Sequence, residues 1–260
     1  MKRSIIFFVL LAAIASCWFF LKPVGSDTAD EGPAIDYTVD NNWWSITFMS
    51  EGTEMPEALA YLPPPPTEGD GRLYYDSLRY EWGKTMRNTP RGDTAVMDVK
   101  SDPEYFMKRF GEVMGIEMTP QTHPKTFYLM AGTLNDIRSS IQSAKKTYAR
   151  PRPYQYFGES TPVPEEEEQD DYTSFPSGHS VRGWAMGVLF STLCPEHEVE
   201  IIRVAYEIGQ SRVIVGFHYQ SDVDASRLAA SAGMARLSAV PAFEKAMAEA
   251  KEEIYSQLKK

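Results

Sequence analysis

The chain has 260 residues, of which 43% are hydrophobic and 24% charged, the proportions of a globular protein with one sizeable core. Acidic residues outnumber basic ones by 36 to 26, which gives a formal net charge of -10. This balance argues against a nucleic-acid partner and against binding to an anionic membrane surface, because both require a basic face. Any cationic binding site must therefore be confined to one cleft.

The N-terminus has the pattern of a secretory signal, since Lys2 and Arg3 precede an apolar run over residues 5–14. Residues 14–17, with the letters IASC, also resemble a bacterial lipobox, in which Cys17 is lipidated. Alternatively, residues 18–21 extend the run into an uncleaved anchor that is short for a helix spanning a bilayer. We expect residues 1–17 to be a signal peptide, of the ordinary or the lipoprotein kind, that directs the chain to the periplasm or cell envelope.

Residues 18–40 become polar and acidic after Ser26 and have no periodic apolar face, so we expect a leader or tether. Residues 41–260 form the expected folded domain. Only Cys194 remains once Cys17 is removed or modified, so no intramolecular disulfide is available to the mature domain. Its stability must come from core packing.

Apolar residues recur at three- and four-residue steps along most of this domain, and no comparable strand alternation competes. The pattern predicts an all-α fold, a single-domain bundle of helices packed on one another. The clearest stretches are Met130 to Ala144, continuing to a helix end near Tyr148, then Val181 to Leu189, Ile201 to Val215, and Phe243 to Leu258.

Between two of these stretches lies an acidic run, Glu165 to Glu168, followed by Asp170 and Asp171. A calcium site or a charged lid is conceivable at this place. Consecutive like charges repel one another and seldom form a compact site, so we interpret the run as a solvated connecting loop.

A first pair of cations, Lys145 and Arg152, flanks the predicted helix end near Tyr148. Pro151 and Pro153 restrict the backbone around Arg152. A guanidinium makes bidentate contacts to a phosphate, and an ammonium supplies a compact charge. Arg150 is a close alternative to Arg152, and surface cations at a helix C-terminus would give the same pattern.

A second motif, Pro176-Ser177-Gly178-His179, directly precedes a predicted helix, where backbone amides and the helix dipole favour an anion. Glycine permits a close approach, and Ser177 can donate its hydroxyl. The structural alternative is that Ser177 only caps the helix and His179 only fills its first turn.

A third motif contains His218 and Asp222, four residues apart, with Arg212 upstream. A carboxylate on one imidazole nitrogen fixes the tautomer and leaves the other nitrogen free as a nucleophile. We expect Gly216 to end a helix and to turn His218 back toward Arg212. A purely structural His–Asp pair is the alternative.

Together, the three motifs resemble those of the type-2 phosphatidic acid phosphatase and vanadium haloperoxidase superfamily. They resemble more closely those of the bacterial class A non-specific acid phosphatases, which are exported all-α enzymes. The resemblance covers most of the chain beyond Tyr61. It rests on the proline run after Leu62, a Tyr-x-Arg-x-Arg-Pro core within 145–158, and the segments 174–180, 209–212 and 221–224.

The resemblance implies a metal-independent hydrolysis of phosphomonoesters of broad range, with no cofactor. Lys145, Arg152 and Arg212 would bind the phosphate, aided by Ser177 and Gly178. His218 would attack phosphorus, Asp222 would orient it, and His179 would protonate the leaving oxygen, so that a phosphohistidine intermediate forms. A homo-oligomer is also implied, and membrane contact only through an N-terminal lipid or anchor. We further expect an acidic optimum, because protonated His179 becomes scarce as the pH rises.

Other enzyme classes fit parts of the sequence. Asp222-Val223-Asp224 superficially fits an aspartate nucleophile motif, but such a motif should follow a buried strand, and the pattern here is helical. Cys194 lacks the nearby arginine that a cysteine phosphatase requires. No apolar stretch after residue 22 is long enough for an integral-membrane lipid phosphatase. A vanadium-dependent haloperoxidase and a catalytically silent phosphate-binding lipoprotein stay open. So does the substrate, since nucleotides, sugar phosphates and diphosphates all present the same phosphoryl end.

Overall fold

A computed structural model of the chain describes residues 37, 42–50, 52 and 54–258, and from Tyr37 on the chain forms one compact unit. In these ranges the regular elements are α-helices and short 3-10 turns, with no strand. The predicted all-α fold is therefore confirmed. None of the helices in the described ranges has the length and apolar character needed to cross a bilayer. The predicted signal, the lipobox and most of the leader lie outside the described residues.

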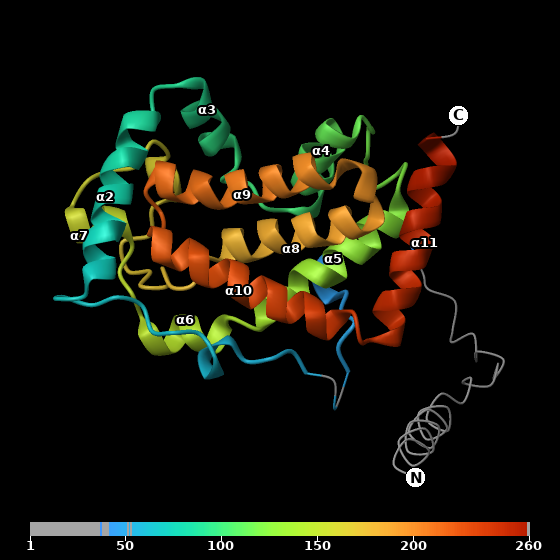
Figure 1. The fold of residues 1–260 in the computed structure, drawn as a ribbon, viewed down its shortest axis with the longest axis horizontal. Helices are drawn as coiled ribbons and strands as arrows, with labels where there is room; N and C mark the ends of the chain where they lie inside the picture. The colour runs from blue at the N-terminus through green and yellow to red at the C-terminus, as the bar shows by residue number, and fades with distance from the viewer. Residues whose placement is uncertain (1–36, 38–41, 51, 53, 259–260) are drawn as a thin grey trace, which may run out of the picture. The chain divides into compact units, whose positions relative to one another are not determined.

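The elements follow one another along the chain, and Figure 1 labels the longer ones. They are η1 (Trp43–Ser45), η2 (Ala58–Ala60), α2 (Gly71–Met86), α3 (Pro90–Met97), α4 (Pro103–Met114), α5 (Pro124–Ser139), α6 (Gln142–Tyr148), α7 (Pro153–Phe157), η3 (Pro164–Glu166), α8 (Gly178–Leu193), η4 (Pro195–His197), α9 (Glu198–Val215), α10 (Gln220–Leu237) and α11 (Pro241–Leu258).

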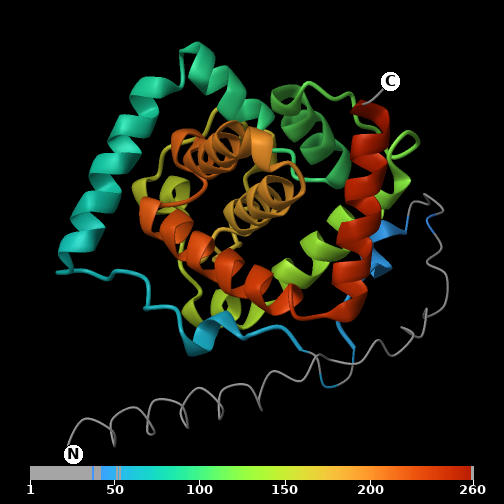
Figure 2. The same cartoon turned by 45° about the vertical axis from the view of Figure 1, so that its right-hand side comes forward.

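Helix α8 occupies the centre of the bundle and packs against α9, α10 and α5, an arrangement that Figures 1 and 2 show from two sides. Apolar side chains such as Val181, Met186 and Phe190 are buried on several faces of α8, so it has little amphipathic character. Helix α11 covers α5, while α2, α3 and α4 cover α9. The main core therefore surrounds α8.

Local sequence signals explain where several helices begin and end. A proline occupies the first turn of α3, α4, α5 and α7, where its missing N–H costs no helical hydrogen bond. Helix α9 ends at Gly216, whose φ of 87° lies in the left-handed region that glycine adopts without strain. The expected break at Gly216 is confirmed.

One predicted helix is wrong in its continuity. The apolar pattern from Met130 to Ala144 predicted a single helix ending near Tyr148, but α5 ends at Ser139 and α6 starts at Gln142. The Ser140 carbonyl accepts a hydrogen bond from the Ala58 amide of η2, at 2.9 Å, instead of one from the next helical turn. The break thus comes from a tertiary contact that local periodicity does not contain.

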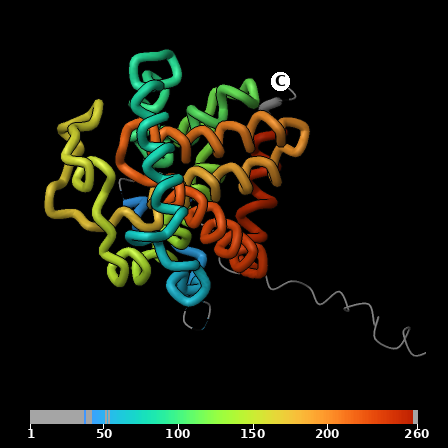
Figure 3. The backbone as a smooth tube through the Cα atoms, turned by 60° about the vertical axis from the view of Figure 1, so that its left-hand side comes forward, coloured from blue at the N-terminus to red at the C-terminus, as the bar shows by residue number. Residues whose placement is uncertain are grey.

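The beginnings of α8 and α10 and the end of α9 meet at one end of the bundle, the left-hand end in Figure 1. The segment between α7 and α8, yellow in Figure 3, loops out on this side before it returns to the start of α8. Every predicted site residue lies on or next to these elements or α6.

Candidate active site

A cavity of about 640 Å³ opens at this end of the bundle. Among the residues that line it are six of the eight predicted site residues: Lys145, Arg152, Gly178, His179, Arg212 and His218. The other two, Ser177 and Asp222, are fully buried behind its wall. Residues from four segments separated by up to about seventy positions therefore reach one pocket.

His218 is buried, and its two ring nitrogens have different partners. Nδ1 lies 2.8 Å from the Ser174 carbonyl oxygen, to which it donates, and Nε2 lies 3.0 Å from Nη1 of Arg152. A guanidinium can only donate, so Nε2 must accept and carry no proton. Burial and the neighbouring Arg152, Lys145 and Arg212 hold the pKa of His218 well below its usual value. The ring thus presents an unprotonated Nε2 to the cavity.

Asp222 supports His218 mainly through other groups. Its Oδ2 lies 3.5 Å from Nδ1 of His218, a long contact, but accepts from the Ser174 hydroxyl at 2.6 Å and from the Tyr219 amide at 2.9 Å. The Ser174 carbonyl therefore fixes the tautomer more directly than Asp222 does. Sequence reasoning missed this contribution of Ser174, because a backbone carbonyl leaves no trace in side-chain identity.

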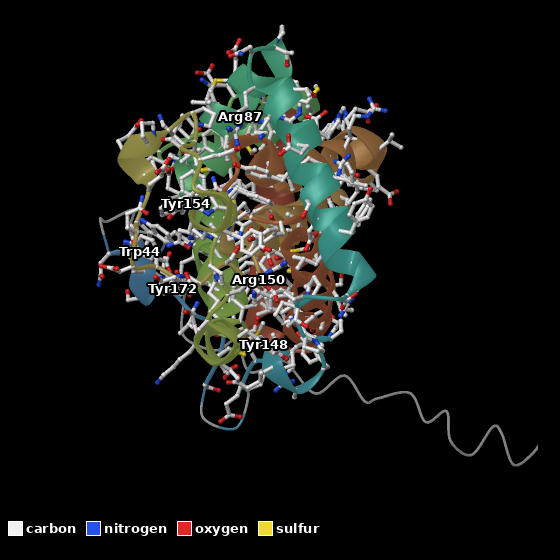
Figure 4. All side chains as sticks on the ribbon, turned by 90° about the vertical axis from the view of Figure 1, so that its left-hand side faces the viewer. Trp44, Arg87, Tyr148, Arg150, Tyr154 and Tyr172 are labelled. Carbon is white, nitrogen blue, oxygen red and sulfur yellow. The ribbon has the colours of Figure 1, made fainter. Side chains whose placement is uncertain are left out.

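Arg150, weighed as an alternative to Arg152, does not line the cavity. Its guanidinium donates to Asp222 at 2.5 Å and to Asp76 of α2 at 2.8 Å, and both carboxylates are fully buried. Ser221 also bonds Asp76, from its amide and its hydroxyl. Arg150 is on the segment that leads into α7, and Figure 4 labels it on the side of this segment that faces helix α2. It joins two elements behind the site.

Lys145 and Arg212 bring positive charge into the cavity, and neither forms an ion pair with a carboxylate in the described part of the chain. The Lys145 ammonium donates to the Thr173 carbonyl at 2.5 Å, and burial and Arg152 lower its pKa to about 7. Arg212 is only 3% exposed, and its Nε and Nη1 are buried and have no hydrogen-bond partner among the residues that the structure describes. Burial, Arg152 and Arg182 lower its pKa to about 9. Buried unpaired donors of this kind favour an anion.

Arg152 has a partner that the sequence interpretation did not foresee. Its Nε and Nη2 donate to Oδ2 of Asp171 at 3.1 and 2.6 Å. Burial tends to raise the pKa of Asp171, but hydrogen bonds from Thr173 and Arg152 outweigh it and lower the pKa. Glu166 and Glu168 also line the cavity. The expected solvated loop is therefore partly wrong, because the acidic run forms one wall of the site.

His179 is half-buried near the start of α8, and its Nε2 lies 2.7 Å from the Val99 carbonyl oxygen, to which it donates. A second proton on this ring must then sit on Nδ1. Burial and the nearby Arg212 and Arg182 lower the pKa of His179 well below its usual value. A bound anion would oppose that effect.

Ser177 caps α8, since its hydroxyl oxygen accepts from the Ser180 amide at 3.3 Å and from the Ser180 hydroxyl at 2.9 Å. Gly178 and His179 then supply the first two amides of the helix, which have no carbonyl partner within it. Gly178 lines the cavity, and a methyl group there would lie 3.8 Å from the Lys145 side chain. The helix start therefore presents amide hydrogens next to the cations.

The cavity thus combines an unprotonated imidazole nitrogen, three cations, the start of a helix and a second imidazole. Such a set can hold a tetrahedral oxyanion and attack it from one side. In the described part of the chain, no group of three or more His, Cys, Asp or Glu side chains is arranged to hold a metal ion.

Comparison with known proteins identifies the family of the chain. Residues 126–243 match the PAP2 superfamily. The chain is 33% identical over 262 residues to a non-specific acid phosphatase of Providencia stuartii, covering 100% of both chains. It is 38% identical over 196 residues to a non-specific acid phosphatase of Salmonella typhimurium, 75% of this chain and 78% of that one. An acid phosphatase of Zymomonas mobilis is 26% identical over 201 residues, 76% of this chain and 75% of that one. The chain therefore belongs to the PAP2 superfamily and, within it, to the class A non-specific acid phosphatases, which are phosphomonoester hydrolases.

Proposed function

We propose that this acid phosphatase cleaves a broad range of small phosphomonoesters through a phosphohistidine on His218, without a metal or cofactor. The observation that carries the proposal is the environment of Arg212, which lines the same cavity as His218. Its Nε and Nη1 are buried and have no hydrogen-bond partner among the described residues. A phosphoryl oxygen would satisfy both nitrogens.

In the proposed complex, Arg212, Arg152 and Lys145 hold the non-bridging oxygens, together with the Gly178 amide at the start of α8. Ser177 aids binding by capping the helix that presents this amide. The phosphoryl group either displaces Asp171 from Arg152 or binds the Arg152 guanidinium together with it. The charge of the phosphate raises the affinity of His179 for a proton, which the cations lower in the free site.

In the first step, the lone pair of His218 Nε2 forms a bond to phosphorus while the bond from phosphorus to the ester oxygen breaks. That oxygen leaves with the electron pair and takes the proton from Nδ1 of His179, so an alcohol departs. The Ser174 carbonyl stabilises the positive charge that develops on the His218 ring, with Asp222 close behind.

In the second step, a water molecule enters where the alcohol was. Nδ1 of His179 takes one proton from the water while its oxygen attacks phosphorus. The bond from phosphorus to Nε2 breaks, the electron pair returns to His218, and inorganic phosphate is released. The protons balance over the two steps, since His179 donates one and regains one.

The test is hydrolysis of a phosphomonoester panel in EDTA by the wild type and by His218→Ala. We expect turnover in EDTA and a loss of at least about a thousandfold in the variant, since losing a nucleophile removes the chemical step. His197→Ala, at a histidine outside the cavity, is the matched control. A rapid alkaline quench should also trap a phosphoenzyme that is stable to base, labile to acid and absent from the variant. Activity that disappears in EDTA, or survives in His218→Ala, would contradict the proposal.

We also propose that residues 1–17 direct export to the periplasm or cell envelope, with residues 18–40 as a tether to the domain over 41–260, and that the mature enzyme is a homo-oligomer. The basic start, apolar run and small residues of the first segment support export. Mass spectrometry of the mature N-terminus would distinguish ordinary cleavage, lipidation at Cys17 and an uncleaved anchor. Sedimentation would measure the oligomeric state.

A further inference from the structure

Besides the proposed phosphate-binding cations Lys145, Arg152 and Arg212, three more cations line the cavity. They are Arg138, Lys146 and Arg182. Arg138 is on the last turn of α5, and Lys146 follows Lys145 on α6. Arg182 is on α8, three residues after His179, so it lies on the same face of that helix. None of these three side chains takes part in the proposed phosphoryl transfer.

Arg138 and Lys146 are exposed at the cavity, and Arg182 is partly buried. Arg138, Lys146 and Arg182 form no ion pair with any residue that the structure describes. Arg182 is half-buried and donates only to two carbonyls, those of Gly178 at 3.3 Å and Ser101 at 3.4 Å. Burial and the nearby Arg138 lower the pKa of Arg182 to about 10. Asp102 acts on the pKa of Arg182 in the opposite direction, but it forms no ion pair with Arg182. Cations gathered at one cavity without an ion-paired carboxylate among the described residues indicate a site for an anion.

Two of the acidic residues that line the cavity, Asp171 and Glu166, lie near cations of the proposed phosphate site. Asp171 is bound to Arg152, and Glu166 is near enough to Arg212 to raise its pKa. The charged side chains that act most strongly on His179, by contrast, are the cations Arg212 and Arg182. A leaving group that takes its proton from His179 therefore passes beside Arg182 rather than beside the acidic wall.

We propose that Arg138, Lys146 and Arg182 form a second anion subsite, and that the preferred substrates are phosphate esters or anhydrides whose leaving group carries another phosphate. The inference rests on the proposed role of His179, because that role sets the direction in which the leaving group extends. Two kinds of substrate carry such a leaving group. In diphosphates an anhydride joins the two phosphates, and in bisphosphates a carbon skeleton joins them at a longer spacing.

The experiment compares kcat/KM for matched pairs of substrates that differ by one phosphate. AMP against ADP tests the anhydride spacing, and fructose 6-phosphate against fructose 1,6-bisphosphate tests the longer one. We expect the wild type to prefer the member with two phosphates in at least one pair. Arg182→Gln and Arg138→Gln should each lower kcat/KM for that member about tenfold more than for its partner, as for the loss of a hydrogen bond to a charged group. Arg182→Lys should keep most of the preference.

Arg203→Gln is the matched control, because Arg203 is exposed on α9, outside the cavity, and its loss changes the net charge equally. Equal losses on both members of a pair would show that Arg182 only supports the fold of the site, and unchanged rates would show that it has no role. A wild type that prefers the single phosphate in both pairs would show that Glu166 and Glu168 dominate. Each of these results overturns the subsite.

A binding measurement separates the subsite from the catalytic proposal. Calorimetric titration of His218→Ala with inorganic phosphate and with pyrophosphate needs no turnover. We expect pyrophosphate to bind more tightly than phosphate, and Arg138→Gln in the same background to weaken pyrophosphate alone. This result would stand even if His218 proved not to be the nucleophile, whereas equal affinities would exclude the subsite on its own.

Discussion

At the scale of single residues, the fold shifts the pKa values of three side chains that line the cavity. His218 and His179 have pKa values held well below the usual range, and Lys145 has one of about 7. In the free enzyme, the proposed nucleophile His218 is therefore neutral over a wide pH range. The acidic optimum expected from His179 alone acquires a second cause, since the Lys145 cation is lost above neutral pH.

Replacing Lys145 by arginine should move the alkaline limb of the pH profile. The limb in kcat/KM reports groups of the free enzyme. Below about pH 7 Lys145 carries the charge with which we propose that it binds phosphate, and above this pH the charge is lost, so kcat/KM should fall. Arginine keeps its charge, so in Lys145→Arg the decline should begin at a higher pH. Wild type and variant measured on one aryl phosphate share the ionisation of the substrate, and an unshifted limb would exclude Lys145 as its cause.

Arg150 should also contribute strongly to the stability of the fold. Arg150→Met should lower the free energy of unfolding by about 3–5 kcal/mol, because Asp76 and Asp222 would remain buried without their shared cation. Urea unfolding measures the change, and Arg203→Met serves as an exposed control expected to stay within about 0.5 kcal/mol of the wild type. A loss below about 1 kcal/mol in Arg150→Met would contradict the account.

Arg150 and Arg152 show what the sequence could and could not specify. Both are arginines beside prolines in one short segment, so residue type placed a phosphate ligand there but could not choose between them on local grounds. The choice depends on Asp76, more than seventy residues upstream, which binds Arg150. The spacing of His218 and Asp222 similarly predicted their proximity, but not that Ser174 would contact both.

At the scale of elements, the connection between α3 and α4 is clamped to α9 behind His179. Asp98 is fully buried and accepts hydrogen bonds from Tyr105, Arg109 and the Ser211 hydroxyl. The next residue, Val99, supplies the carbonyl that holds His179. Asp98 therefore positions the proposed proton donor through the backbone without touching the substrate.

Asp98→Asn should lower kcat about tenfold with little change in KM, because an amide cannot accept from every donor around it and the Val99 carbonyl shifts. The effect should be larger for an alkyl phosphate than for p-nitrophenyl phosphate, whose leaving group needs less help from a proton. Equal losses on the two substrates, with rates corrected for the folded fraction, would instead indicate a general loss of structure.

The element scale also explains the two corrected expectations. Periodicity could not reveal the break between α5 and α6, because the Ser140 carbonyl is taken by Ala58, a long-range partner. Charge repulsion predicted that the acidic run would avoid a compact site, but Asp171 meets Arg152 in a cavity rich in cations. The composition of the run gave no means of predicting which carboxylate would turn inward.

At the scale of the whole molecule, a chain with a net charge of -10 holds a local cluster of cations that oppose one another. The folded-state pKa of Lys145, about 7, lies below its ordinary value of 10.5, so the unfolded chain binds more protons between these values. This group alone therefore makes the phosphate-free protein more stable as the pH rises from about 7 to 10. An anion that fills the cavity relieves the same repulsion.

Arg212→Met should consequently raise the stability of the phosphate-free protein while removing its response to phosphate. Methionine fills a similar space without a buried charge, so we expect a gain of about 1 kcal/mol in the free energy of unfolding. In the wild type, phosphate at a hundred times its dissociation constant should add about 2.7 kcal/mol, and the variant should show almost none of this at the same concentration. Thermal unfolding with and without phosphate measures both effects. A variant that is less stable than the wild type without phosphate, or that responds to phosphate equally, would show that Arg212 is not the unpaired charge around which the site is built.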